Sequence, residues 1–275
     1  MFYKRALSAI ILVIIALTVI LTGGALLIVV LYMLSLIAFF ELTKAVGIHL
    51  PDKIINPLEA AAILGITLYY GSIFFIKSES SMNFALILGF MAIMFVYVFS
   101  FPKFNANEVM TTFFCMIYAP VLLSFIYLTR NLKFGIYVVW LIFISSWICD
   151  TCAYLVGMLF GRHKMAPRLS PKKSIEGAVG GVVGSAVVGA LFGYYVQLYV
   201  LSSERLVMIF AIIGALGATI SQVGDLAASA IKRNHDKKDY GKLIPGHGGV
   251  MDRFDSVIFS APMIYFLAYF LMNQL

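Results

Sequence analysis

The chain has 275 residues, of which 62% are hydrophobic and only 12% are charged. A soluble domain of this length would carry about twice that charged fraction, so the composition excludes a water-soluble globule. The apolar residues form unbroken runs without alternation, which favours membrane helices over a β-barrel. The net charge of +7 is typical of basic cytoplasmic loops in a membrane protein, and we do not interpret it as a nucleic-acid footprint.

The apolar runs predict nine transmembrane helices, because each run is close to the about 20 residues that span a bilayer. The predicted helices cover residues 6–22, 24–46, 58–76, 82–100, 109–129, 134–160, 175–200, 205–232 and 253–273. We interpret the first run as a retained helix rather than a signal peptide, since it exceeds a signal core of roughly 7–15 residues. The predicted fold is an all-α integral membrane protein, a polytopic helical bundle.

The positions of the basic residues predict the orientation of this bundle. We place the N-terminus in the cytoplasm and the C-terminus outside. Every Lys and Arg then lies on the cytoplasmic face except Lys77, Arg130, Lys133 and Arg205. This distribution follows the positive-inside rule. The short chain lacks an evident organelle-targeting peptide, so we expect a bacterial cell (cytoplasmic) membrane and a functional site that faces the cytoplasm.

The polar chemistry is concentrated in the C-terminal half. We divide the chain into N-terminal transmembrane helices at 1–130 and a C-terminal functional region at 131–275. This second region contains two basic cytoplasmic loops, at 161–176 and 232–252, whose prolines and glycines disfavour helix. Composition alone supports two interpretations of these loops equally: topology signals that contact lipid headgroups, or parts of a functional site.

Glycines and cysteines in the C-terminal half are interpreted as packing residues. The pairs Gly177–Gly181, Gly180–Gly184 and Gly189–Gly193 follow the small-xxx-small pattern that lets another helix approach closely. Whether that helix belongs to the same chain or to a second copy in a homodimer is left open. Cys149 and Cys152 form a C-x-x-C without a second pair, which favours packing over a metal or redox site.

We single out two of the acidic residues inside predicted helices, where ionisable groups are costly and often functional. They are Asp150 and Asp225. Asp225, Ser229 and Lys232 are spaced i, i+4, i+7 and therefore share one face of a helix. We interpret this face as the wall of a polar cavity that opens to the cytoplasm. A structural ion pair or hydrogen bond is the alternative interpretation for each aspartate.

A second acidic pair begins the last predicted helix. Asp252 and Asp255 are spaced i, i+3, and the helix macrodipole favours negative charge in a first turn, so both are also explained as ordinary N-terminal acids. The Gly-His-Gly-Gly run at 246–249 favours a ligand site instead, because glycines let backbone amides approach a ligand closely.

The sequence thus offers three carboxylates, on Asp225, Asp252 and Asp255, amid many cations. These cations are Lys232, Arg233, Lys238, Lys242 and Arg253. Carboxylates bind Mg²⁺, which also coordinates substrate phosphates, and Lys and Arg neutralise phosphate oxygens. The combination predicts a phosphoryl or nucleotidyl substrate. The sequence contains neither a Walker A motif nor a G-x-S-x-G nucleophile elbow.

The segment from Ser229 to Asp255 reads S-x-I-K-R-x4-K-D-x-G-x2-I-P-x-H-G-G-x2-D-R-F-D. It closely resembles the signature of the CDP-diacylglycerol synthase (phosphatidate cytidylyltransferase) family. The upstream segment at 161–177 and the D-T-x-A-Y and G-D-L-x-x-S motifs around Asp150 and Asp225 are also similar to that family. Ser174 stands where Thr is common, and this departure keeps the hydroxyl. The resemblance covers about the last 130 residues, and the N-terminal helices carry no comparable pattern.

The resemblance implies an enzyme that condenses CTP with phosphatidic acid, with Mg²⁺ as cofactor, to give CDP-diacylglycerol and pyrophosphate. It implies that Asp225, Asp252 and Asp255 hold one or two metal ions, and that Ser229 and Lys232 contact the reacting phosphates. The remaining implied substrate-binding residues are Asp150, Lys172, Lys173, Ser174, Arg233, Lys238, Lys242, His247, Gly248, Gly249 and Arg253. The implied partners are the two substrates and the lipid bilayer, with no nucleic acid.

Three alternatives stay open at this point. A transporter for an anionic solute would also carry intramembrane aspartates, although we find no internal repeat of the kind typical of transporters. A CTP-dependent lipid kinase would also bind CTP and a lipid, but it would phosphorylate a lipid alcohol and release CDP instead of pyrophosphate. A non-enzymatic scaffold is the third.

Overall fold

The structure is a computed structural model, and it describes residues 14–49, 54–241, 243 and 248–272. Within these residues, eight helices are long and apolar enough to cross a membrane. These spans are Gly24–Ala45, Pro57–Ile76, Glu79–Phe99, Ala106–Arg130, Gly135–Phe160, Ile175–Tyr199, Leu206–Asn234 and Met251–Met272. They confirm the predicted polytopic helical class. Residues 14–22 are helical as well, and the start of that first predicted helix lies outside the described residues.

The chain forms two compact units. Unit 1 comprises Met1–Ser124 and Asn234–Arg253, and unit 2 comprises Phe125–Arg233 and Phe254–Leu275. The first boundary lies near the predicted one at 130/131, but 234–253 belongs with the N-terminal helices by its contacts. The functional division between the two halves stays a prediction.

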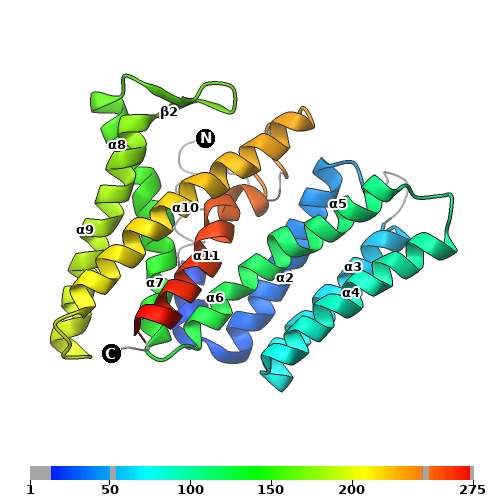
Figure 1. Cartoon of the computed structure of the whole chain (residues 1–275), viewed down its shortest axis with the longest axis horizontal. Coiled ribbons are helices and arrows are strands. Elements are labelled where there is room, and N and C mark those ends of the chain that lie inside the picture. Colours follow the sequence, from blue (N-terminus) through cyan, green and yellow to red (C-terminus); the bar gives the residue numbers. More distant parts are fainter. Residues whose placement is uncertain (1–13, 50–53, 242, 244–247, 273–275) are drawn as a thin grey trace. The chain divides into compact units, whose positions relative to one another are not determined.

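Unit 1 is built from helices that pack through small residues. It contains α2 (Gly24–Ala45), α3 (Pro57–Gly71), η1 (Ser72–Ile76), α4 (Glu79–Phe99), α5 (Ala106–Met116), η2 (Ile117–Val121) and the start of α6 (Leu122–Arg130). Helices α3 and α4 lie side by side (Figure 1). A Cβ placed on Gly65 would lie 2.7 Å from the Cα of Gly89, so only glycines permit this approach.

Unit 2 contains the remaining elements. They are the rest of α6, α7 (Gly135–Phe143), η3 (Ile144–Ile148), α8 (Cys149–Phe160), β1 (Lys164–Ala166), β2 (Ser170–Ser174), α9 (Ile175–Tyr199), most of α10 (Leu206–Asn234) and most of α11 (Met251–Met272). Helices α8 and α9 lie side by side, with the β1–β2 hairpin at the end of the pair (Figure 1).

The predicted glycine contacts of α9 form within the chain. A Cβ on Gly177 would lie 2.6 Å from the carbonyl oxygen of Ala153 in α8, and one on Gly189 would lie 2.6 Å from that of Phe210 in α10. One stretch of α9 therefore fits α8 and the next fits α10. Because these glycines pack inside one chain, they supply no argument for a homodimer.

Two local features were not predicted. Three of the long helices contain a π-helical turn, at η1, η2 and η3, and η2 includes Pro120, which has no N–H to donate to a regular helix. The basic loop at 161–176 is non-helical up to Ser174, as predicted, but it forms an antiparallel hairpin in which Lys164 pairs with Ser174. This hairpin brings Lys172 and Lys173 onto a strand that leads directly into α9.

Candidate active site

An ion pair joins the two motif-bearing segments of unit 2. The Nζ of Lys173, on β2, donates a hydrogen bond to Oδ2 of Asp225, on α10. Both side chains are largely buried, with exposed fractions of 28% and 24%. The contact spans 52 positions of the sequence, so the tertiary fold alone creates it.

Two further aspartates interact electrostatically with this ion pair. Asp150, near the start of α8, interacts electrostatically with Lys173 and Asp225. Asp255, in the first turns of α11, interacts with Asp225, Lys232 and Asp150. We name these five residues (Asp150, Lys173, Asp225, Lys232 and Asp255) the charged cluster. Four elements, α8, β2, α10 and α11, contribute to it.

The sequence explains how α10 and α11 come close enough to form the cluster. Gly224 precedes Asp225, and a Cβ placed on it would lie 2.9 Å from the carbonyl oxygen of Asp255 and 2.8 Å from the Cβ of Phe259. A larger residue at 224 would separate the two helices. On α10 the predicted stripe of Asp225, Ser229 and Lys232 is half-buried along its length, as expected for one helix face that lines a polar site.

Asp252 is described within unit 1, where it binds backbone amides. Its Oδ2 accepts hydrogen bonds from the amides of Tyr240, at 2.8 Å, and Gly249, at 3.0 Å. Gly248 between them has a φ of 82°, which few residues other than glycine adopt. The carboxylate therefore links the backbone at 240–241 to that at 248–252, and we name these described residues the signature turn.

The other predicted residues have varied environments. Ser174 is buried, and its hydroxyl accepts a hydrogen bond from the Gly177 amide and caps α9. Lys172, Arg233, Lys238 and Arg253 are exposed. Lys242 and His247 lie outside the described residues. No observation tests the substrate contacts predicted for these residues, and they stay predictions.

The residues predicted to bind magnesium are present, but they do not form a set of metal ligands in the described residues. Within the described residues, no three His, Cys, Asp or Glu side chains are gathered closely enough to hold a metal ion. Asp225 binds Lys173, and Asp252 binds loop amides. The carboxylates of unit 2 supply oxygen atoms, the type of ligand that a hard divalent cation prefers.

Sequence reasoning missed one acidic residue that contacts the signature turn. Glu41, on α2, accepts hydrogen bonds from the amides of Val250 and Met251. The available signal was an ionisable residue inside a predicted membrane helix, the same signal that singled out Asp150 and Asp225.

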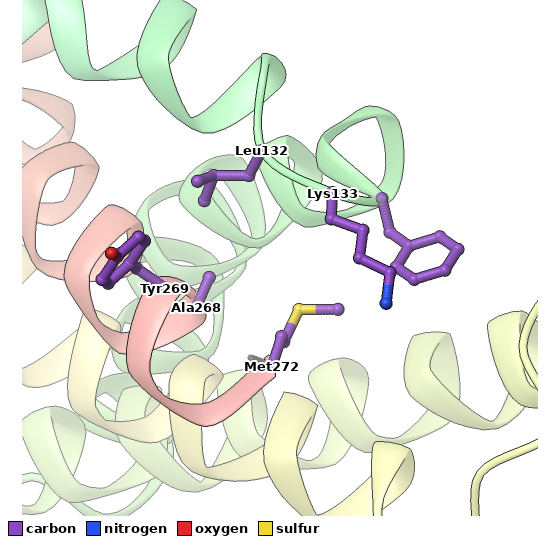
Figure 2. Close-up of a pocket in the computed structure, with 6 residues that line it drawn as sticks. Leu132, Lys133, Ala268, Tyr269 and Met272 are labelled. Atoms are coloured by element: carbon purple, nitrogen blue, oxygen red, sulfur yellow. The ribbon is translucent and has the colours of Figure 1, made fainter. Parts of the chain in front are cut away.

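A pocket elsewhere in unit 2 does not compete with the charged cluster as a site. It is lined by Leu132, Lys133, Phe134, Ala268, Tyr269 and Met272 (Figure 2). The lining from α11 comes from its last turns, whereas Asp255 lies at its start, about 20–25 Å away along the axis at 1.5 Å per residue. The lining offers one cation and no carboxylate, so it lacks the chemistry of the cluster.

Comparison with known proteins places the whole chain in one family. The model of the cytidylyltransferase family matches residues 3–271. A phosphatidate cytidylyltransferase of Staphylococcus saprophyticus is 31% identical over 268 residues, which cover 96% of this chain and 97% of the relative. That of Staphylococcus haemolyticus is 32% identical with the same coverage, and that of Bacillus subtilis is 29% identical over 96% of both chains. The similarity includes the N-terminal helices, where no motif was recognisable, and the chain belongs to the cytidylyltransferase family.

Proposed function

We propose that this chain is a phosphatidate cytidylyltransferase, which converts CTP and phosphatidic acid into CDP-diacylglycerol and pyrophosphate. The observation that carries the proposal is the charged cluster, in a chain that is similar along nearly its whole length to relatives of that name. Membrane helices suit a substrate whose acyl chains stay in the bilayer.

The proposed reaction is a nucleotidyl transfer. An oxygen of the phosphatidate phosphate attacks the α-phosphorus of CTP, and the bond from that phosphorus to the oxygen bridging to the β-phosphate breaks. Pyrophosphate leaves with the electron pair. The attacking oxygen is already anionic, so the step needs no strong general base. It needs two polyanions to be held together, which is work of positioning and electrostatic stabilisation.

The residue roles follow from the charges. Lys232, with Ser229 one turn before it, contacts the reacting phosphates, and Lys172, Lys173 and Ser174 of the hairpin contact the CTP phosphates or the lipid headgroup. When a substrate phosphate binds, it replaces Asp225 as the anionic partner of Lys173. Pyrophosphate is bound by Lys238, Lys242, Gly248 and Gly249. The substrate site is also lined by Arg233, His247, Arg253 and Asp150.

Magnesium is part of the proposal. Asp225, Asp252 and Asp255 are the proposed ligands of one or two ions, and Asp150 adds a fourth oxygen donor near Asp225. Bound Mg²⁺ supplies neutralisation of phosphate charge. The lysines supply the same neutralisation from the protein, so carboxylates and lysines act on one group of phosphates.

The proposed setting is the cytoplasmic membrane of a bacterium, with the N-terminus and the active site in the cytoplasm and the C-terminus outside. The supporting observation is the clustering of basic residues in the two loops that flank α9 and α10. Single cysteines placed at Lys172 and at Glu204 test this, because a membrane-impermeant thiol reagent added to intact cells should label only the second.

A transfer assay tests the reaction. The purified protein in detergent receives phosphatidic acid, Mg²⁺ and CTP labelled at the α-phosphate. We expect label in the lipid phase and an equimolar release of pyrophosphate. Label from the γ-phosphate in the lipid, with release of CDP, would instead establish a lipid kinase. Absence of lipid label from either form of CTP, with folded protein, would remove the proposed function and favour a transporter.

A further inference from the structure

The strongest unassigned feature is the Glu41 carboxylate of unit 1. Its Oε1 accepts a hydrogen bond from the Val250 amide at 3.1 Å, and its Oε2 accepts one from the Met251 amide at 2.8 Å. Both oxygens are thus used, each by one donor. The donors lie 209 and 210 positions further along the sequence.

These two amides are groups that need a partner. They lie where α11 begins, and the first amides of a helix have no acceptor within the helix. A carboxylate is favoured there because it accepts charge-assisted hydrogen bonds and opposes the positive end of the helix dipole. Glu41, on a helix near the opposite end of the chain, therefore supplies acceptors for amides at the start of α11.

Two glycines of the signature turn lie against the same carboxylate. Cβ atoms placed on Gly241 or Gly249 would collide with carboxylate oxygens of Glu41. From the sequence alone, the Gly-His-Gly-Gly run at 246–249 predicts a backbone that a ligand can approach closely. At Gly249 the structure supplies a different reason for glycine, which is room for Glu41.

The same turn is held from its other side by Asp252. Gly249 donates its amide to Asp252, and the next two amides, of Val250 and Met251, donate to Glu41. Three consecutive amides thus bind two carboxylates. Since both carboxylates bind one short segment, a change at Glu41 alters the backbone that orients Asp252.

We propose that Glu41 is a positioning residue for the transfer reaction, which holds the signature turn in the conformation that orients Asp252. This inference rests on the proposed function, and it gives a role to an N-terminal helix that carries no motif. Glu41 touches no reacting atom in this role. Its effect on the rate passes through the backbone of residues 249–252.

Three substitutions at Glu41 separate positioning from folding. Glu41→Gln keeps one carbonyl acceptor and turns an NH₂ group toward the second amide. Glu41→Ala removes both acceptors. The matched control is Glu59→Gln, since Glu59 is a buried carboxylate of unit 1 that accepts the Asn56 amide at the start of α3 and does not touch the signature turn. Glu41→Asp keeps the charge and shortens the reach.

We expect kcat per folded molecule to fall about 10-fold in Glu41→Gln, which loses one charge-assisted hydrogen bond to the turn, and about 100-fold in Glu41→Ala, which loses both. KM for CTP should change less than about three-fold, since binding and positioning are separable. Amide hydrogen exchange of peptides covering 249–252 should accelerate in both variants and not in Glu59→Gln. A fall in kcat of Glu41→Ala no larger than that of Glu59→Gln would overturn the inference.

The exchange measurement keeps the two proposals distinguishable. If the unmodified chain transfers no label from CTP, the proposed function fails by itself. Exchange of residues 249–252 then decides the role of Glu41 alone: unchanged exchange in Glu41→Ala would show that the carboxylate does not hold the turn. If the unmodified chain is active and Glu41→Ala does not fold, Glu41→Gln and Glu41→Asp carry the test.

Discussion

Unit 1 and unit 2 use their carboxylates in different ways. In unit 2, the charged cluster consists of side chains that interact with one another, with Lys173 and Asp225 in direct contact. In unit 1, Glu41 and Asp252 bind backbone amides of the signature turn. In the charged cluster, a substrate phosphate or a metal ion can replace one partner of an ion pair. At the signature turn, the carboxylates hold a backbone conformation.

The difference predicts two kinds of variant. A substitution in the charged cluster should change the reaction through the electrostatic field at the phosphates. A substitution at the signature turn should change it through the position of the backbone, and should respond to residue size as well as charge. The predictions below are ordered by the size of the expected effect.

The largest effect is expected for Asp225→Asn. The change removes a proposed metal ligand and the carboxylate that accepts the Lys173 hydrogen bond, so we expect a loss of about 1,000-fold or more in transfer of the α-phosphate label. Glu204→Gln, an exposed carboxylate outside the cluster, is the control and should keep full activity. An active Asp225→Asn protein would remove the cluster from the mechanism.

Asp252→Asn should lose about 100-fold, while the protein still inserts and extracts normally. An amide side chain keeps one acceptor for the Tyr240 and Gly249 amides but loses the charge that favours both the hydrogen bonds and the metal. The measurement is turnover as a function of Mg²⁺ concentration. Turnover at the normal rate would show that the metal assignment of Asp252 is wrong.

Gly249→Ala tests whether the turn responds to size alone. The added methyl group meets the Glu41 carboxylate, so we expect about a 10-fold loss of kcat from a displacement of roughly an ångström. Gly71→Ala is the matched control in the same unit, since a Cβ there has nothing within 4 Å. Equal activities of the two variants would contradict the close fit around Glu41.

The smallest effect is expected for Ser174→Ala, which removes the N-cap of α9. The lost hydrogen bond to the Gly177 amide should lower the free energy of unfolding by about 1 kcal/mol. Thermal unfolding in detergent measures this change. A fall in kcat per folded molecule would support the proposed contact of this hydroxyl with substrate, and an unchanged kcat would leave capping of α9 as its role.

The sequence determined the features that depend on neighbouring residues. Run length and hydrophobicity predicted the eight spans to within a few residues, since a bilayer fixes the length of a helix. Prolines predicted a non-helical loop at 161–176, and helical periodicity predicted the half-buried stripe on α10. The motifs of the C-terminal half identified the family.

The tertiary structure alone decided which distant groups meet. The ion pair of Lys173 with Asp225 joins positions 52 residues apart, and the contact of Glu41 with the Met251 amide joins positions 210 apart. No local pattern encodes such pairs, because they depend on which helix faces pack and on glycines, such as Gly224 and Gly249, that let backbones approach. The sequence named most of the charged residues, and packing selected their partners.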